Sequence, residues 1–196
     1  MKEENKILKM YKETGALQIG HFVLSSGLHS EVYLQSAKVL SIPKYLKTIA
    51  ASLALKIKNK IKISMIDLIV APAMGGIVIG SKIGEELNKK SIFLERVNSQ
   101  FSLRRGFEIN KNDRVLIVED VITTGKSSIE CINCVERLGG KVLAVASIVD
   151  RSINEIKFEM KQISLIKIDA PIYSNKELPE RLKKIPEKKP GSRFLK

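Results

Sequence analysis

The chain of 196 residues is 44% hydrophobic and 28% charged, which fits a soluble globular domain that buries a core without disulfides or a structural metal. Its longest nearly uncharged run, residues 68–80, is shorter than the ~20 residues of a membrane-spanning helix and therefore excludes one. We interpret the net charge of +13 mainly as a means of keeping the protein soluble. The alternatives are an electric field that steers anionic substrates and a nucleic-acid-binding surface, but no nucleic-acid-binding motif accompanies the charge.

The first predicted elements form a helix, a hairpin and a second helix. Residues 3–14 form a charged helix that Gly15 ends, and since no apolar signal segment precedes it we expect a cytoplasmic protein. Residues 15–40 carry apolar residues on both sides of a Ser-Ser-Gly turn, which predicts a short two-stranded hood that also serves as a lid. A helix is predicted from Pro43 to about Asn59, with one apolar face.

From residue 60 to residue 170, apolar strands alternate with helices. Strands are predicted at 65–73, 91–96, 114–120, 141–150 and 163–169, helices at 76–89 and 126–138, and a polar loop after residue 96. This order predicts an α/β fold, with a mostly parallel sheet, helices on both faces, and ligands at the carboxyl ends of the strands. The chain is thus one domain, with a hood at 15–40, a core at 60–170 and a basic tail at 171–196.

The stretch VLIVEDVITTGKSS, residues 115–128, ends an apolar strand in two carboxylates, Glu119 and Asp120, and then turns into a helix. Gly125 permits a positive φ, so the amides from Thr123 to Ser127 can converge on one point. The positive end of the helix dipole and the hydroxyls of the turn favour the same anion. The turn is therefore predicted to hold a phosphate.

The paired carboxylates call for a second kind of ligand group. A nucleoside-triphosphatase loop needs a glycine where Asp120 stands, which excludes that site. No G-x-G-x-x-G pattern is present, so a dinucleotide site is not expected. Ionised carboxylates accept hydrogen bonds, and vicinal sugar hydroxyls donate them. Negative charge beneath a ribose also stabilises positive charge developing at its anomeric carbon. We therefore predict a ligand that contains a ribose 5-phosphate.

With these residues the stretch resembles the signature of the type I phosphoribosyltransferases, which bind 5-phosphoribosyl pyrophosphate (PRPP). Further segments, in the expected order, resemble the short subfamily of orotate phosphoribosyltransferases: GHFVLSSGLHSEVYLQS, IVAPAMGG, LERVNSQFSLRRGFEI, SIVDRS and KPGSR. The resemblance implies the type I fold and transfer of the phosphoribosyl group from PRPP to orotate, giving orotidine 5-phosphate and pyrophosphate in pyrimidine biosynthesis. It also implies an oxocarbenium-like transition state, Mg²⁺ held mainly through PRPP and water, and a homodimer whose catalytic loop closes over the neighbouring subunit.

The resemblance assigns roles residue by residue. The residues implied to bind PRPP are Glu119 and Asp120 on the ribose hydroxyls, Thr123, Thr124, Gly125, Lys126 and Ser127 on the 5-phosphate, and Ala73, Met74 and Gly75 on the pyrophosphate. The Ala73–Met74 bond is a candidate for a cis peptide. The residues implied to bind orotate are Ser25, Ser26, Tyr33, Thr123 and Arg151, the last as a bidentate partner of the orotate carboxylate. The residues implied to be catalytic are Arg96, Arg104, Arg105 and Asp120, the arginines flanking a mobile loop.

Simpler interpretations stay open beside these roles. Arg151 could form a surface Asp-Arg pair, Tyr33 could be a core aromatic, and the arginine-flanked loop could be a solvated connection. Longer family members carry lysines and a histidine on that loop, and this chain has neither, which leaves open the group that protonates the leaving oxygen. The rival functions are a phosphoribosyltransferase for a purine or another base, and a PRPP-sensing nucleic-acid regulator without activity.

Four residues that often carry chemistry receive no role. Cys131 and Cys134 follow helical spacing and lack a second ligand pair, so we expect small core residues rather than a zinc or redox site. His21 and His29 have no partner nearby in the sequence and are treated as non-catalytic. The tail contains no cysteine, and no metal is expected in it.

Overall fold

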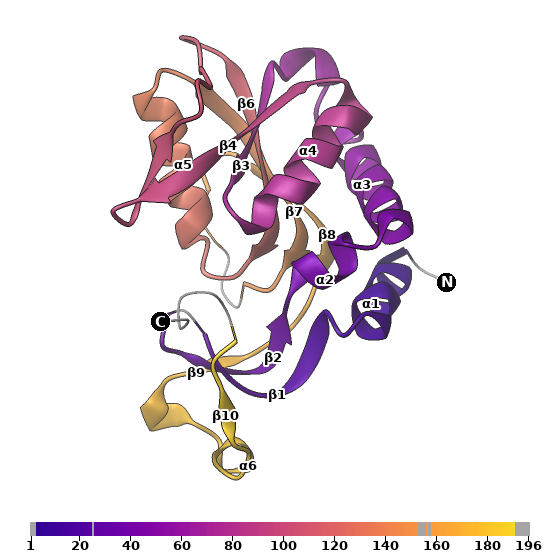
Figure 1. Ribbon diagram of the computed structural model, residues 1–196, viewed down its shortest axis with the longest axis vertical. Coiled ribbons are helices and arrows are strands. Elements are labelled where there is room, and N and C mark those ends of the chain that lie inside the picture. The colour runs from indigo at the N-terminus through magenta and orange to yellow at the C-terminus, as the bar shows by residue number, and fades with distance from the viewer. Residues whose placement is uncertain (1–2, 25, 153–155, 157, 191–196) are drawn as a thin grey trace.

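The computed structural model describes residues 3–24, 26–152, 156 and 158–190, which form an α/β core and a smaller second sheet (Figure 1). The core sheet has the strand order β5-β4-β3-β6-β7-β8. All neighbours are parallel except β4 and β5. The strands are β3 (Leu68–Pro72), β4 (Lys90–Val97), β5 (Gln100–Leu103), β6 (Arg114–Ile122), β7 (Lys141–Asp150) and β8 (Lys161–Lys167). The predicted mostly parallel sheet is confirmed.

Helices cover both faces of this sheet, as predicted. They are α1 (Glu3–Glu13), α2 (Ser36–Leu40), α3 (Pro43–Lys58), α4 (Gly75–Leu87) and α5 (Lys126–Arg137), with a short 3-10 turn at Ile63–Met65. In Figure 1, α3 and α4 lie on one side of the sheet and α5 on the other. None of the helices in the described ranges is both long and apolar enough to cross a membrane.

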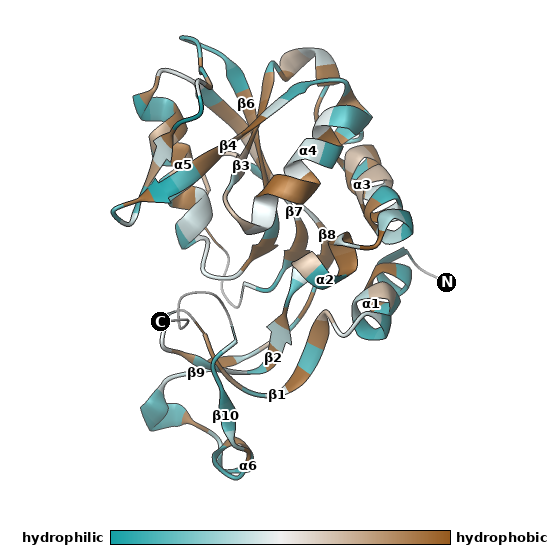
Figure 2. Ribbon diagram, viewed as in Figure 1, coloured by the Kyte–Doolittle hydropathy of each residue, from teal (hydrophilic) through white to brown (hydrophobic). Residues whose placement is uncertain are grey.

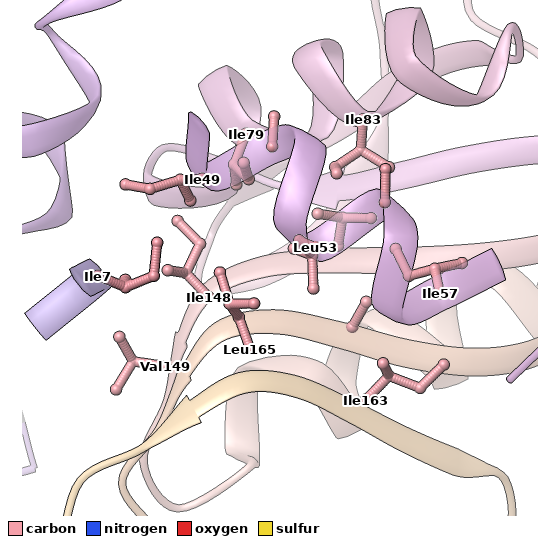
Figure 3. Close-up of a cluster of buried hydrophobic side chains, with 14 of the residues drawn as sticks. Ile7, Ile49, Leu53, Ile57, Ile79, Ile83, Ile148, Val149, Ile163 and Leu165 are labelled. Carbon is pink, nitrogen blue, oxygen red and sulfur yellow. The ribbon is translucent and has the colours of Figure 1, made fainter. Parts of the chain in front are cut away.

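Alternation along the strands divides the core into two clusters. On β6, Leu116 and Val118 belong to the cluster under α1, α3 and α4, while Val115 and Ile117 belong to the cluster under α5. Figure 3 shows side chains from α1, α3, α4, β7 and β8 packed together in the first cluster. The strands through the centre of the molecule are accordingly the most hydrophobic part of the ribbon (Figure 2). Cys131 and Cys134 are free, buried side chains of the second cluster, as expected.

The hood is a four-stranded sheet with the order β10-β1-β2-β9. Its centre is the predicted hairpin, formed by β1 (Leu17–Val23) and β2 (His29–Leu34) in antiparallel pairing. The outer strands, β9 (Ile172–Tyr173) and β10 (Glu187–Lys188), come from the tail, together with a 3-10 turn at Asn175–Glu177 and α6 (Glu180–Lys183). The tail thus completes the hood sheet on both edges, which no pattern in the sequence indicated.

The segment after β4 differs from the polar loop that we predicted. Residues 100–103 form β5 and pair with β4, and Asn98 and Ser99 make the turn with φ values of 48° and 66°. A two-residue turn with both φ values positive matches the twist of antiparallel strands, and asparagine tolerates it. The polar sequence of the segment led to the prediction of a loop, because a strand at the edge of a sheet keeps one side exposed to water and can therefore be polar.

Candidate active site

A cavity of about 850 Å³ lies at the carboxyl end of β6 and the start of α5. Its walls are formed by Ser26, Arg96, Ser99, Glu119, Val121, Ile122, Thr123, Thr124, Gly125, Lys126, Ser127, Ser128 and Glu130. This is the edge at which parallel α/β sheets bind ligands. The structure therefore brings the hood, the strand-end acid Glu119 and the turn before α5 together around one space.

The turn before α5 has the geometry of an anion site. Gly125 adopts φ +74°, and a Cβ atom at this residue would come within 2.8 Å of Ile156. Both constraints require glycine at this position. The helix then begins at Lys126, and residues 125–128 line the cavity. The first amides of a helix lack the intrahelical carbonyl partners that later turns have. These amides and the helix dipole favour a phosphate at the turn.

The two carboxylates beneath the turn sit in an environment that disfavours their charge. Glu119 is 6% exposed, and burial together with the neighbouring Asp120 raises its pKa well above the ordinary value. Burial also raises the pKa of Asp120, an effect that hydrogen bonds from the Val121 amide and from Ser36 oppose. No cation among the described residues forms a salt bridge with either carboxylate. Hydroxyl donors from a ribose would therefore stabilise the ionised forms.

The loop between β3 and α4 approaches Asp120 closely. A Cβ atom at Gly75 would lie 2.6 Å from the Asp120 Oδ1 atom, so glycine is required for this contact. The Ala73–Met74 peptide bond is cis, which confirms the candidate bond. The Ala73 amide, however, donates to the Leu94 carbonyl at 2.8 Å, and this corrects its expected role as a pyrophosphate donor. Strand pairing continues to that residue, which leaves Met74 and Gly75 as the candidates.

Arg151 is a buried cation without a carboxylate partner in the described residues. Its side chain is 3% exposed and reaches β2, where its guanidinium donates to Ser30 Oγ at 2.8 Å and to the Val32 carbonyl at 3.2 Å. Its Nε atom has no hydrogen-bond partner. Burial lowers the pKa of this guanidinium. The interpretation as an exposed Asp-Arg pair is wrong, because Asp150 instead accepts hydrogen bonds from Ser152 and Gln162.

The hood residues lie near the acids and Arg151. Ser26 lines the cavity, and Tyr33 is half-buried with its ring 5.5 Å from that of Phe22. Burial and the charge of Asp120 raise the pKa of Tyr33. The Arg151 amide donates to the carbonyl of Ile122, a cavity residue, so the base-binding candidates adjoin the cavity. Ser25 lies outside the described residues.

The three arginines expected to be catalytic occupy different places. Arg96 lines the cavity, lies 4.1 Å above the Phe101 ring, and donates to Ser127 Oγ at 3.3 Å. Arg104 and Arg105 are exposed and do not line the cavity of their own chain. Arg105 forms a bidentate pair with Glu95, at 2.8 and 3.0 Å.

Two residues of the site were missed from the sequence. Glu130 pairs with Arg96 at 2.5 Å and so holds that guanidinium beside the phosphate turn. Its position one helical turn beyond Lys126 was a weak signal. Ser36 lies 3.0 Å from the hydroxyl of Tyr11 and opposes the rise in the pKa of Asp120. No sequence pattern links residues so far apart.

Comparisons with known proteins agree with this geometry. Residues 36–182 match the family model of the phosphoribosyl transferase domain. The chain is 46% identical to the orotate phosphoribosyltransferase of Erythrobacter litoralis over 97% of this chain and 98% of that protein. It is 42% identical to the enzyme of the same name from Caldanaerobacter subterraneus, over 98% of this chain and 100% of that protein.

Solved structures share the fold. The orotate phosphoribosyltransferase of Aeropyrum pernix superposes with a TM-score of 0.67 at 25% identity, covering 83% of this chain and 93% of that one. An adenine phosphoribosyltransferase superposes with a TM-score of 0.62 at 17% identity, covering 80% of this chain and 99% of that one. The second likeness shows the fold alone. The shape of the fold therefore does not select the base.

Proposed function

The chain belongs to the orotate phosphoribosyltransferases of the phosphoribosyl transferase domain family, and we propose that it makes orotidine 5-phosphate from orotate and PRPP. In this reaction orotate N1 loses its proton and forms a bond to the anomeric carbon, and the bond from that carbon to pyrophosphate breaks. The observation that carries the choice of base is Arg151, a buried guanidinium whose Nε has no partner and which forms no salt bridge within the described part of the chain. A carboxylated base supplies the partner that purines lack.

The remaining substrate contacts follow from the cavity. The 5-phosphate lies at the turn formed by Thr123, Thr124, Gly125, Lys126 and Ser127, and the ribose hydroxyls lie on Glu119 and Asp120. The pyrophosphate lies toward Met74 and Gly75, whose loop touches Asp120. Orotate lies between Ser26, Tyr33, Thr123 and Arg151. The net charge of +13 favours the approach of both anionic substrates.

Catalysis in this proposal is electrostatic and positional. The anomeric carbon gains positive charge as pyrophosphate departs, and the carboxylates of Glu119 and Asp120 lie beneath the ribose to stabilise it. Both substrates are held on rigid strand ends, which removes the entropy of bringing them together. Mg²⁺ would neutralise the leaving pyrophosphate. It would be held mainly by PRPP oxygens and water, since the described residues around the cavity offer no group of three ligating side chains.

A homodimer would explain the positions of the loop arginines. Arg96 already faces the cavity of its own chain, where Glu130 and Ser127 hold it. Arg104 and Arg105 follow β5, are exposed and do not line that cavity. We propose that they close over the site of a neighbouring subunit and neutralise the departing pyrophosphate there.

The experiment is to follow orotate absorbance with PRPP and Mg²⁺, with adenine, hypoxanthine and uracil tested in parallel. Consumption of orotate that requires both PRPP and Mg²⁺, with the other bases inert, is the expected result. Turnover of another base in place of orotate would leave the PRPP site intact and overturn the role of Arg151. Binding of PRPP without turnover of any base, together with salt-sensitive binding of nucleic acid, would replace the enzyme by a regulator.

A further inference from the structure

Three side chains of the hood form a cluster that phosphoribosyl transfer does not use. His21 on β1 and His29 on β2 are 4% and 5% exposed, and Glu187 on β10 is exposed. One ligand atom from each residue lies within 4.8 Å of those of the other two. Among the described residues, no other group of three or more histidines, cysteines and acids is arranged in this way.

Strand pairing brings the three side chains onto one face of the hood sheet. His21 pairs directly with Glu187 across the parallel β1–β10 ladder. His29 pairs with Val23 across the antiparallel β1–β2 ladder, and Val23 is two residues beyond His21. The β1–β2 register shifts between Ile19 and Phe22, so the meeting of the three side chains is shown by their ligand atoms, which lie within 4.8 Å of one another. The cluster is therefore built by the sheet and does not depend on a flexible surface contact.

Hydrogen bonding fixes the protonation of one imidazole. His21 Nδ1 lies 3.0 Å from the carbonyl of Ile185. A carbonyl only accepts, so Nδ1 carries the proton and, in the neutral ring, Nε2 has a bare lone pair. That Nε2 atom faces His29 Nδ1 at 2.7 Å. A backbone carbonyl that orients an imidazole in this way is the usual outer support of a metal-binding histidine.

We propose that His21 Nε2, His29 Nδ1 and the Glu187 carboxylate bind one divalent transition-metal ion, with zinc the best match. Two imidazoles and one carboxylate, with water in a fourth position, form a donor set that zinc accepts in tetrahedral geometry. Zinc–nitrogen bonds of about 2.0–2.1 Å place two tetrahedral ligand nitrogens about 3.3 Å apart. The rings, 2.7 Å apart at these atoms, need only a small separation to admit the ion.

Two features of the cluster leave the carboxylate available. Glu187 pairs with Lys189 at 3.3 Å, but both side chains are about half exposed, and such a pair is easily given up. The carboxylate also lies on the water-facing side of two buried imidazoles, which gives an ion a route of entry.

The ion would fasten the tail to the hood. The β10 strand is two residues long, and α6 contributes one fully buried apolar side chain, Leu182. The ion pair between Arg181 of the tail and Glu31 of the hood is largely exposed and adds little to this attachment. Small elements with little core commonly depend on a metal or a disulfide. A bond from each of β1, β2 and β10 to one ion would connect three strands at once.

The test uses the full-length protein without a polyhistidine tag, freed of metal with a chelator and then titrated with Zn²⁺ by calorimetry. Cobalt(II) absorption in the visible range reports the coordination geometry. The variants are His21→Gln, Glu187→Gln and, as a matched control, Glu180→Gln, which removes an exposed tail acid paired with Lys183. Neither ligand variant touches the PRPP site, so metal binding is read separately from activity.

The expected result is about one zinc ion per chain, tetrahedral cobalt bands, and a melting temperature that rises with zinc. Glu187→Gln weakens binding by at least about tenfold, His21→Gln weakens it further, and Glu180→Gln leaves it unchanged. Absence of stoichiometric zinc binding, or equal binding by His21→Gln and the wild type, would overturn the proposal. The histidines would then form an ordinary hydrogen-bonded pair. Either result is independent of turnover of orotate.

Discussion

Replacing Arg151 by methionine tests the proposed choice of base most directly. Methionine keeps an unbranched apolar chain in this buried position, but it removes the guanidinium that would pair with the orotate carboxylate. Removing one partner of a buried charge pair costs about 2–5 kcal/mol, which corresponds to about a 30- to 5,000-fold loss in kcat/KM for orotate. The hydrogen bonds of Arg151 run to Ser30 and Val32 of the hood, away from the phosphate turn. The KM for PRPP should therefore change by less than about threefold.

The assay is initial-rate kinetics with each substrate varied in turn, on variants whose thermal unfolding shows an intact fold. Arg151→Lys should fall between the wild type and Arg151→Met, since it keeps the charge and loses the planar fork. Arg114→Met is the matched control, because Arg114 makes a bidentate pair with Asp67 at the opposite, amino end of β6. Equal losses for orotate and PRPP in Arg151→Met would refute the assignment, as would a loss of the same size in Arg114→Met.

Three further predictions concern the acids, the loop and the dimer. Burial and Asp120 raise the pKa of Glu119, so the folded protein binds the proton of the Glu119 carboxyl more tightly than the unfolded chain does. The free energy of unfolding therefore falls as the pH rises from the ordinary glutamate pKa toward the raised one. Glu119→Gln should therefore raise the melting temperature more at pH 8 than at pH 4, and equal shifts of the melting temperature at both pH values would contradict this pH dependence. The same substitution should lower kcat/KM about 10- to 150-fold. Gly75→Ala places a Cβ atom 2.6 Å from Asp120 Oδ1 and so displaces the Asp120 carboxylate. Steady-state kinetics should show a loss of at least tenfold in kcat/KM for PRPP, and unchanged kinetics would show that the position of this carboxylate does not matter for the reaction. Mixing inactive Arg104→Ala and Asp120→Asn chains should restore about one quarter of the activity, since half of the dimers are mixed and each has one intact site; no recovery would argue against a shared loop.

The sequence predicted the parts of this molecule that depend on near neighbours in the chain. Residues 115–128 contain an apolar strand, two acids, a glycine and the start of a helix. The conformation of this segment depends mainly on these residues and their near neighbours in the chain. The helix that begins at Pro43 and the β7 strand were placed with nearly correct bounds for the same reason. Local patterns of this kind carry the phosphate turn and the order of the sheet.

What the sequence did not predict depends on pairing between distant segments. The strands β9 and β10 have two residues each, too few for any period, and they exist because the hood offers them free edges. Glu130 acts by pairing with Arg96, and Ser36 contacts the distant Tyr11. Neither a glutamate nor a serine at those positions carries a recognisable signal in the sequence. The Ala73 amide was misassigned because the extent of β3–β4 pairing decides which amides remain free.

The electrostatics of the site give a reason for its selectivity. Burial raises the pKa of Glu119 and Asp120 and lowers the pKa of Arg151, so each group is held where its charged form is disfavoured. The fold keeps these opposite charges apart, although a salt bridge between them would relieve both. Each charge can instead be satisfied by a substrate group of matching chemistry, ribose hydroxyls for the acids and a carboxylate for the guanidinium. A base without a carboxylate would leave the Arg151 cation buried and unpaired, and this penalty, more than any new contact, would exclude it.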